Sequence, residues 1–287
     1  MEWASAKKFV IILLLILNIC LFGLNYHQKR EDAMSASQER AIFEVLSQNG
    51  ITMYTNLITE YAPMRRLSVT VPSYTKEELE NIFFHGEKTT VVPGSKNTVY
   101  QLGDTRLILD GQKGSLIFED TKKENPSAAP MTGKDALDLA QAYMNDIQPY
   151  FPDFTPSGTT EAENGFYVEF HGNYRKQPVF SNCFRFFVAD HTIQSIDFTY
   201  CKIGGYTGEK KDIFYSDEAL LTFMRELNPK QNVDEITVHR MELGYDLLEQ
   251  GEFPENGTFN LVPCYRIYTM EQNTPYIVNA YTCQIVE

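Results

Sequence analysis

The sequence predicts an α+β protein that has an N-terminal transmembrane helix, a small mixed α/β domain and two αβββ repeats with antiparallel sheets. Three observations lead to this fold class. An apolar run opens the chain, 17 Tyr and 19 Phe favour strands, and a helix followed by strand-like segments occurs twice in the second half. The expected segments are a tail at 1–8, a transmembrane helix at 9–26, a juxtamembrane helix and the small domain at 27–121, a linker at 122–131, and the repeats at 132–208 and 209–287.

The apolar run extends from Phe9 to Leu24 and follows the pair Lys7-Lys8. At about 1.5 Å per residue, residues 9–26 reach roughly 27 Å, which is enough to cross a hydrocarbon core. The alternative is a cleaved signal peptide, but no small-residue cleavage site follows the run directly. We therefore expect a retained single-pass anchor in the cell membrane. The flanking basic residues are nearly balanced, so we base the expected orientation, with the N-terminus cytoplasmic and the body extracytoplasmic, on the large cysteine-bearing body that follows.

The charge of the chain excludes one class of function. Its formal net charge is −13 at pH 7, from 38 acidic and 25 basic side chains. A nucleic-acid-binding protein needs a surplus of Lys and Arg to replace the counterions of the phosphates. We expect no nucleic-acid partner.

The small domain is expected to combine helices with short strands. Residues 36–49 have apolar side chains at helical spacing and end at Gly50, which predicts a juxtamembrane helix. Thr75 and Glu78 have the spacing of a capping box that opens a short helix through Phe84. Strands are expected at 67–71, 98–102, 105–110 and 114–118. The charged, proline-containing segment at 122–131 is typical of a linker.

The second half repeats one pattern. The helix predicted at 133–147 precedes strands at 165–171, 182–189 and 194–201, and the helix at 217–227 precedes strands at 236–245, 259–270 and 276–282. The closest local match is Asn182-Cys-Phe-Arg-Phe186 against Pro263-Cys-Tyr-Arg-Ile267. Each unit would bury one face of its sheet under its own helix.

Four cysteines occupy equivalent places in the two repeats. Cys183 and Cys201 are equidistant from a turn expected at 190–193, and Cys264 and Cys283 from a turn at 272–274. Opposed residues of an antiparallel hairpin lie close enough for a disulfide. The alternative is that all four are buried free thiols. Both interpretations remain open from the sequence.

The search for catalytic residues finds only weak patterns. Ser73 and Lys76 match the S-x-x-K spacing of acyl-transfer enzymes, but helix capping and solvation explain both residues. The histidines of the body are scattered, and no metal-ligand spacing links them to the cysteines. We expect neither a catalytic residue, nor a cofactor, nor a metal site, and we predict that the protein is not an enzyme.

Inside the predicted span, four residues that are three or four positions apart form a stripe on one helical face. The stripe consists of Leu14, Asn18, Leu21 and Asn25. A buried amide can hydrogen-bond to another helix within the membrane. The stripe therefore predicts contact with a partner's transmembrane helix, and the alternative is that Asn18 bonds to its own backbone.

These features resemble a known family. The opening Met-Glu2-Trp3, the paired lysines, Leu15-Ile-Leu-Asn18 within the span, and two αβββ units after a juxtamembrane helix are similar to the YycI family. The entrance Gln177-Pro-Val-Phe180 also resembles PepSY-type modules, which bind or inhibit. The resemblance implies a single-pass accessory protein that acts with a YycH-like protein on an envelope-sensing histidine kinase of the WalK/YycG type, and thereby on cell-wall homeostasis in Gram-positive bacteria.

The resemblance thus implies a regulator that acts by protein contact, through its transmembrane helix and its external domain. A further extracellular ligand remains open. The alternative from a different class is an extracytoplasmic envelope enzyme, an inhibitor or a ligand-binding module. A pocket that gathers Ser73, Lys76 and an acid or base would favour an enzyme.

Overall fold

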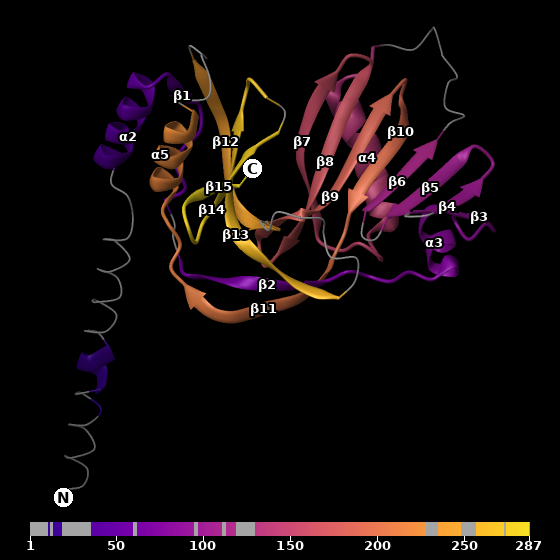
Figure 1. Cartoon of the computed structure of the whole chain (residues 1–287), viewed down its shortest axis with the longest axis horizontal. Coiled ribbons are helices and arrows are strands. Elements are labelled where there is room, and N and C mark those ends of the chain that lie inside the picture. Colours follow the sequence, from indigo (N-terminus) through magenta and orange to yellow (C-terminus); the bar gives the residue numbers. More distant parts are fainter. Residues whose placement is uncertain are drawn as a thin grey trace, which may run out of the picture. The chain divides into compact units, whose positions relative to one another are not determined.

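The computed structural model describes residues 11, 14–18, 36–59, 62–94, 97–110, 113–118, 130–227, 235–247, 257–272 and 274–286. These residues form a mixed α/β structure with few helices and a predominance of antiparallel sheet (Figure 1). Among them, no helix is both long and apolar enough to cross a membrane. Most of the span predicted at 9–26 lies outside the described residues.

The chain divides into two compact units. Unit 1 comprises Met1–Pro63, Asp212–Glu242 and Ile267–Ile285, and unit 2 comprises Met64–Lys211, Leu243–Arg266 and Val286–Glu287. Two long strands, β12 (Ile236–Asp246) and β13 (Thr258–Thr269), have residues in both units. The units therefore do not follow the predicted order of a small domain, a linker and two repeats.

Unit 2 contains an eight-stranded antiparallel sheet in the order β7-β8-β9-β10-β6-β5-β4-β3. The strands are β3 (Thr90–Pro93), β4 (Thr98–Leu102), β5 (Thr105–Asp110), β6 (Lys113–Phe118), β7 (Phe154–Ala162), β8 (Gly165–Tyr174), β9 (Gln177–Ala189) and β10 (Thr192–Thr199). The pairing of β6 with β10 joins the predicted small domain and the predicted first repeat in one sheet. Alternation along a strand identifies its buried face but does not identify its neighbour.

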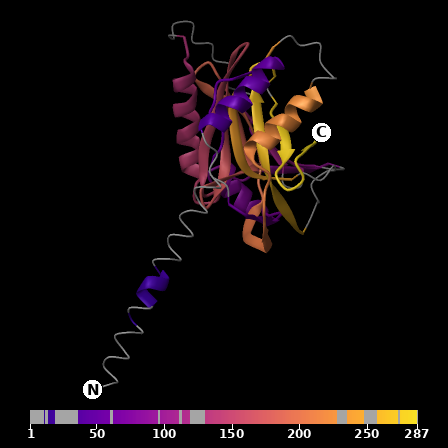
Figure 2. The same ribbon diagram turned by 90° about the vertical axis from the view of Figure 1, so that its left-hand side faces the viewer.

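Two helices cover one face of this sheet, and Figures 1 and 2 show α4 against it. The helices are α3 (Lys76–Phe83) and α4 (Gly133–Ile147). Helix α4 has its predicted bounds and begins with a capping box, in which Thr132 accepts from the Asp135 amide. It buries Ala136, Ala140 and Met144. These small and flexible side chains fit against the large aromatic rings of β8, β9 and β10.

Unit 2 also contains a second set of paired strands. Strand β2 (Met64–Thr70) lies between β11 (Lys202–Lys211) and the first residues of β13, and both pairings are antiparallel. Glycines and a proline explain why β11 and β7 were not predicted. Gly204, Gly205 and Gly208 interrupt the apolar alternation of β11, while Pro156 and Gly158 do the same in the edge strand β7.

Unit 1 combines two helices with short strands. Its elements are α2 (Ala36–Gln48), β1 (Ile51–Met53), α5 (Ser216–Leu227) and β14 (Tyr276–Asn279), together with parts of β12, β13 and β15 (Gln284–Val286). Helix α2 confirms the helix predicted at 36–49, without testing whether it lies next to a membrane. Helix α5 buries Leu220 and Phe223, and the Phe223 ring lies 4.8 Å from that of Tyr276. Strand β1 pairs with β12 in parallel, which was not predicted.

Glu80 connects α3 to the segment before β3. Its side chain is 1% exposed and accepts hydrogen bonds from the Thr89 amide at 2.7 Å, the Thr89 hydroxyl at 3.1 Å and Lys88 Nζ at 3.2 Å. The backbone hydrogen bond from Thr89 is the main cause that lowers the pKa of Glu80 from 4.5 to about 2. The carboxylate is therefore the form that the fold stabilises.

We expect the stability contributed by Glu80 to be present above about pH 4.5 and lost as the pH falls towards 2. This sign follows because the folded pKa lies below the unfolded one, so protonation favours unfolding. Urea unfolding at pH 6 and pH 3 measures this contribution as the difference in free energy of unfolding between the wild type and Glu80→Gln. We expect this difference to be smaller at pH 3. A difference that is equal at both pH values would contradict the assignment.

Candidate functional site

The face of the unit 2 sheet opposite α3 and α4 has a row of side chains across five strands. Direct register pairs place Ile108 beside Ser115, Ser115 beside Asp197, Asp197 beside Arg185, and Arg185 beside Glu169. Directly paired residues of an antiparallel sheet lie on the same face. The neighbouring row, which contains Leu116, Ile196 and Phe186, belongs to the core. The first row therefore lies on the other face, which we call the open face.

Polar contacts connect members of this row. The Ser115 hydroxyl donates to Asp197 Oδ1 at 2.7 Å. Arg185 turns the other way: its Nε lies 3.4 Å from Glu169 Oε1, and its guanidinium carbon lies 4.2 Å from the centre of the Tyr167 ring. Arg185 and Asp197 are both exposed, so each charge is in contact with solvent. The open face thus presents an acidic and a basic group side by side.

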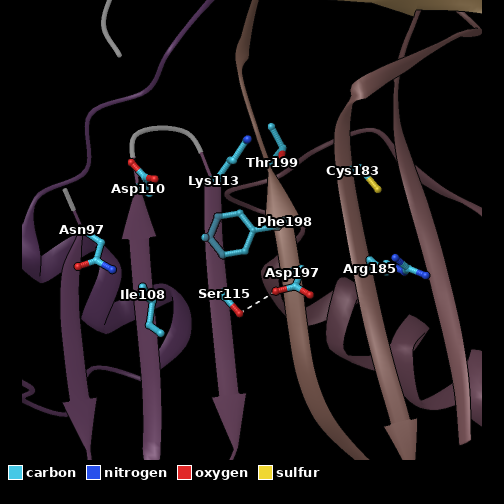
Figure 3. Close-up of a pocket in the computed structure, with 11 residues that line it drawn as sticks. Asn97, Ile108, Asp110, Lys113, Ser115, Cys183, Arg185, Asp197, Phe198 and Thr199 are labelled. Atoms are coloured by element: carbon cyan, nitrogen blue, oxygen red, sulfur yellow. Dashed lines mark hydrogen bonds between the residues drawn. The ribbon is translucent and has the colours of Figure 1, made fainter. Parts of the chain in front are cut away.

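A shallow pocket of about 440 Å³ lies over β5, β6, β9 and β10 (Figure 3). It is lined by Asn97, Ile108, Asp110, Lys113, Gly114, Ser115, Cys183, Arg185, Asp197, Phe198 and Thr199. Aliphatic and aromatic surface alternates with hydroxyl, amide and charged groups of both signs. Such a lining suits contact with a protein segment or a small polar molecule.

A glycine leaves room for the ring of Phe198, which lines this pocket from the core face of the sheet. Phe198 pairs directly with Gly114, and a Cβ atom added at Gly114 would lie 2.1 Å from Phe198 Cζ. Any other residue at position 114 would therefore displace the ring. Phe198 also stacks on Phe83 at 5.3 Å and on Phe184 at 5.2 Å, so it links the pocket to the core.

Cys183 lies in this pocket as a thiol of low reactivity. Burial, followed by the charge of Glu169, raises its pKa to about 12. The thiolate is the nucleophilic form of cysteine, and at neutral pH it would be scarce here. Burial likewise raises the pKa of Cys201 to about 12 and that of Cys264 well above its ordinary value.

The predicted register of Cys183 and Cys201 is wrong. Cys183 lies opposite Thr199, because the hairpin turns at Asp190-His191, between the paired Ala189 and Thr192, and not about residue 192 as the prediction required. Cys201 lies beyond the end of β10, where its amide donates to Asn182 Oδ1 at 2.8 Å and its carbonyl accepts from Asn182 Nδ2 at 2.9 Å. Both cysteines are free thiols.

The second pair of cysteines also departs from the predicted hairpin. Cys264 belongs to unit 2 and Cys283 to unit 1, and both are free. Strand β14 ends at Asn279, so Cys283 lies in the turn that follows it, with φ 54°. Its sulfur lies 3.3 Å from the Thr222 hydroxyl. The prediction extended this strand to residue 282 and placed Cys283 directly after it, opposite Cys264.

A buried ionic network in unit 2 was not predicted. Asp246 Oδ1 accepts from the Ser181 hydroxyl at 2.6 Å, and Asp246 Oδ2 accepts from Arg266 Nε at 3.1 Å. The Leu247 amide donates to Asp246 Oδ1 at 3.0 Å, and the Arg266 guanidinium lies 4.3 Å from the centre of the Phe180 ring. The network ties β9, β12 and β13 together. In the sequence, Arg266 was part of only one pattern, the match between residues 182–186 and 263–267 of the two repeats.

Lys76 of the S-x-x-K pattern contacts residues other than Ser73. Thr75 and Glu78 confirm the predicted capping box, and Lys76 Nζ donates to the Thr89 carbonyl at 2.8 Å. Lys76 also lies 3.5 Å from Glu80 Oε1. Ser73 is exposed just before this helix. Among the described residues, no group of three or more His, Cys, Asp or Glu side chains could hold a metal ion.

The structure describes half of the stripe predicted within the span. Asn18 Nδ2 donates to the Leu14 carbonyl at 2.9 Å. This is the bond to its own helix that the sequence left as an alternative. Leu21 and Asn25 lie outside the described residues.

Comparisons with known proteins add information on the fold. No family model matches the chain, and no curated protein does so. Among solved structures, an uncharacterized protein from Eubacterium rectale ATCC 33656 is 12% identical with a TM-score of 0.54, covering 83% of this chain and 91% of that chain. The Bacillus megaterium YpeB C-terminal domain is 12% identical with a TM-score of 0.39, covering 73% and 92%. The first similarity supports the mixed, mainly antiparallel fold and nothing further.

Proposed function

We propose that this protein is a membrane-anchored extracytoplasmic regulator that acts by protein contact. The observation that carries the proposal is the open face, where Arg185, Asp197 and the pocket beside them lie opposite the two covering helices. Exposed tyrosine, phenylalanine and arginine side chains are enriched at protein–protein interfaces. Tyr167 and Phe187 pair across β8 and β9 on this face, with ring centres 5.0 Å apart.

The proposed partners follow from the N-terminal resemblance to the YycI family. They are a histidine kinase of the WalK/YycG type and a YycH-like accessory protein. The order of α4 with β8, β9 and β10, and of α5 with β12, β13 and β14, agrees with two PepSY-like αβββ units. In the first unit β7 is added before the three strands. On this proposal, the apolar segment at 9–26 anchors the chain and its Asn18 contacts a helix of the kinase.

The chemistry of the described residues favours contact over catalysis. The pKa of the Cys183 thiol is raised, so it is not activated as a nucleophile. Lys76 is engaged with Thr89 and Glu80, which favours its role in fixing α3 over that of a base for Ser73. We therefore propose a regulator that is not an enzyme.

Reversing one charge on the open face should disrupt partner binding without unfolding the protein. Arg185→Glu would place a third carboxylate beside Glu169 and Asp197, and a disrupted rim charge pair costs little stability because solvent screens it. We expect recovery of the kinase or the YycH-like protein from native membranes to fall about tenfold. Quantitative pull-down with the full-length chain as bait measures this.

The matched control is Lys134→Glu, which reverses an exposed charge on α4. It should leave recovery of both partners unchanged. Equal recovery with wild type and Arg185→Glu, while both variants unfold like the wild type, would contradict the use of the open face.

A further inference from the structure

A cluster of basic residues stands out in this acidic chain. It lies at one end of the paired strands β2 and β11 and at the turn between β8 and β9, all within unit 2. We call it the basic ribbon, and it consists of Arg65, Arg66, Arg175, Lys176, Lys210 and Lys211. All six side chains belong to exposed residues, whereas the chain as a whole has a net charge of −13. The local sign of the surface is therefore opposite to that of the protein.

The strand register brings these residues together. Thr207 pairs with Arg66 and Lys211 with Met64, so the two arginines of β2 lie beside the two lysines of β11. Neighbouring strands are separated by about 4.8 Å. Figure 1 shows β2 and β11 running side by side over their length. The four charges therefore lie at one end of the paired strands.

Two tyrosines connect the turn at 174–177 to the paired strands β2 and β11. Tyr206 pairs with Leu67, next to Arg66, and its ring lies 5.0 Å from that of Tyr174. The Arg175 guanidinium lies 5.5 Å from the centre of each tyrosine ring. Arg175 and Lys176 thus extend the basic surface away from the strands.

Among the described residues, no acidic side chain forms an ion pair that neutralises these charges. In the part of the chain that the structure describes, none of the six side chains forms an ion pair, although Glu209 lies on the same strand. Uncompensated like charges repel one another, and this repulsion is relieved when an anionic surface covers them.

The backbone of the edge strand β11 is irregular. Register shifts occur between Ile203 and Gly205 and again between Thr207 and Lys211. Gly205 and Gly208 have φ values of +115° and +70°, which favour glycine. Bulges of this kind bend a strand and keep other strands from pairing with its edge. This edge is consequently suited to a surface rather than to an added strand.

We propose that the basic ribbon binds the headgroups of an anionic phospholipid bilayer. Clustered lysine and arginine side chains attract anionic lipids, and tyrosine is enriched at the membrane interface. The inference rests on the proposed function, because the anchor at 9–26 would hold the body near a membrane. Binding would fix the orientation of unit 2 at the surface, and so limit the directions from which a partner reaches it.

The test uses the full-length chain with vesicles of phosphatidylcholine alone or of phosphatidylcholine with phosphatidylglycerol. A fluorescent amino acid replaces Thr207, and a quencher is attached to the lipid headgroups. We expect at least threefold stronger quenching in the anionic vesicles, and loss of this excess in concentrated salt. Lys210→Glu should remove most of the excess, whereas Lys134→Glu on α4 should retain it.

Two readouts separate this inference from the proposed function. Resistance to alkaline extraction reports the anchor in both kinds of vesicle. Salt-sensitive quenching measures binding of the ribbon to the headgroups. Flotation with anionic vesicles measures the same binding for chains whose anchor is not inserted. Equal quenching in the two kinds of vesicle, or equal quenching for Lys210→Glu and the wild type, would overturn the inference. The chain could also associate with itself without any change in quenching by the lipids. If Lys210→Glu abolished that association, the ribbon would instead bind a second copy of the chain.

Discussion

Replacing Asp246 by alanine should lower the free energy of unfolding by about 3–5 kcal/mol. The change leaves the Arg266 guanidinium, whose side chain is 16% exposed, without its carboxylate. The Ser181 hydroxyl and the Leu247 amide lose the same acceptor. A buried charge without a partner keeps its desolvation cost and loses the attraction that offset it. Urea unfolding followed by circular dichroism measures the loss.

The control for this prediction is Asp197→Ala on the open face. Asp197 is exposed and accepts from Ser115, so its removal should cost less than about 1 kcal/mol. Similar losses for the two variants would show that the network around Asp246 is not a buried ionic network.

Phe184→Ala should be similarly destabilising, by about 3–5 kcal/mol. Its side chain is fully buried at the centre of the aromatic core, with ring centres 5.0 Å from Phe151 and Phe154 and 5.2 Å from Phe198. Rigid rings on three sides leave little room for the core to close over the cavity. The midpoint of thermal unfolding should fall accordingly, and a second measurement in urea gives the free energy.

Phe187→Ala is the matched control on the same strand. Phe187 is half-buried on the open face and contacts the Tyr167 ring, so its removal exposes little of the core. We expect a loss well below that of Phe184→Ala. A larger loss would mean that the open face is packed against other parts of the protein.

The sequence predicted the local elements better than their neighbours. Helix α4 and the strands at 98–102 and 105–110 have their predicted bounds, because caps, glycine turns and alternating side chains are local signals. The parallel pairing of β1 with β12 and the joining of β6 to β10 depend on contacts distant in sequence. Edge strands such as β7, which contain Pro and Gly, have no alternating pattern to detect.

The candidate site was harder to predict for a related reason. The row from Ile108 to Glu169 exists only once five strands are in register, and these strands come from two separated parts of the chain. The hairpin turns at Asp190-His191 and not about residue 192, and this difference is enough to place Cys183 opposite Thr199. Counting residues from a turn depends on the exact position of the turn, and a small error there changes which residues of the two strands face each other.

The measurement that tests the central proposal most directly is photocrosslinking from the open face in native membranes. A photoreactive amino acid replaces Ile117 on β6, which shares the open face through its pairing with Ser195, and a second chain has it at the exposed Asp138 on α4. The account predicts that the position 117 probe crosslinks to the histidine kinase or the YycH-like protein, and that the position 138 probe does not. Equal crosslinking from both positions, or crosslinking to these partners from position 138 alone, would contradict it.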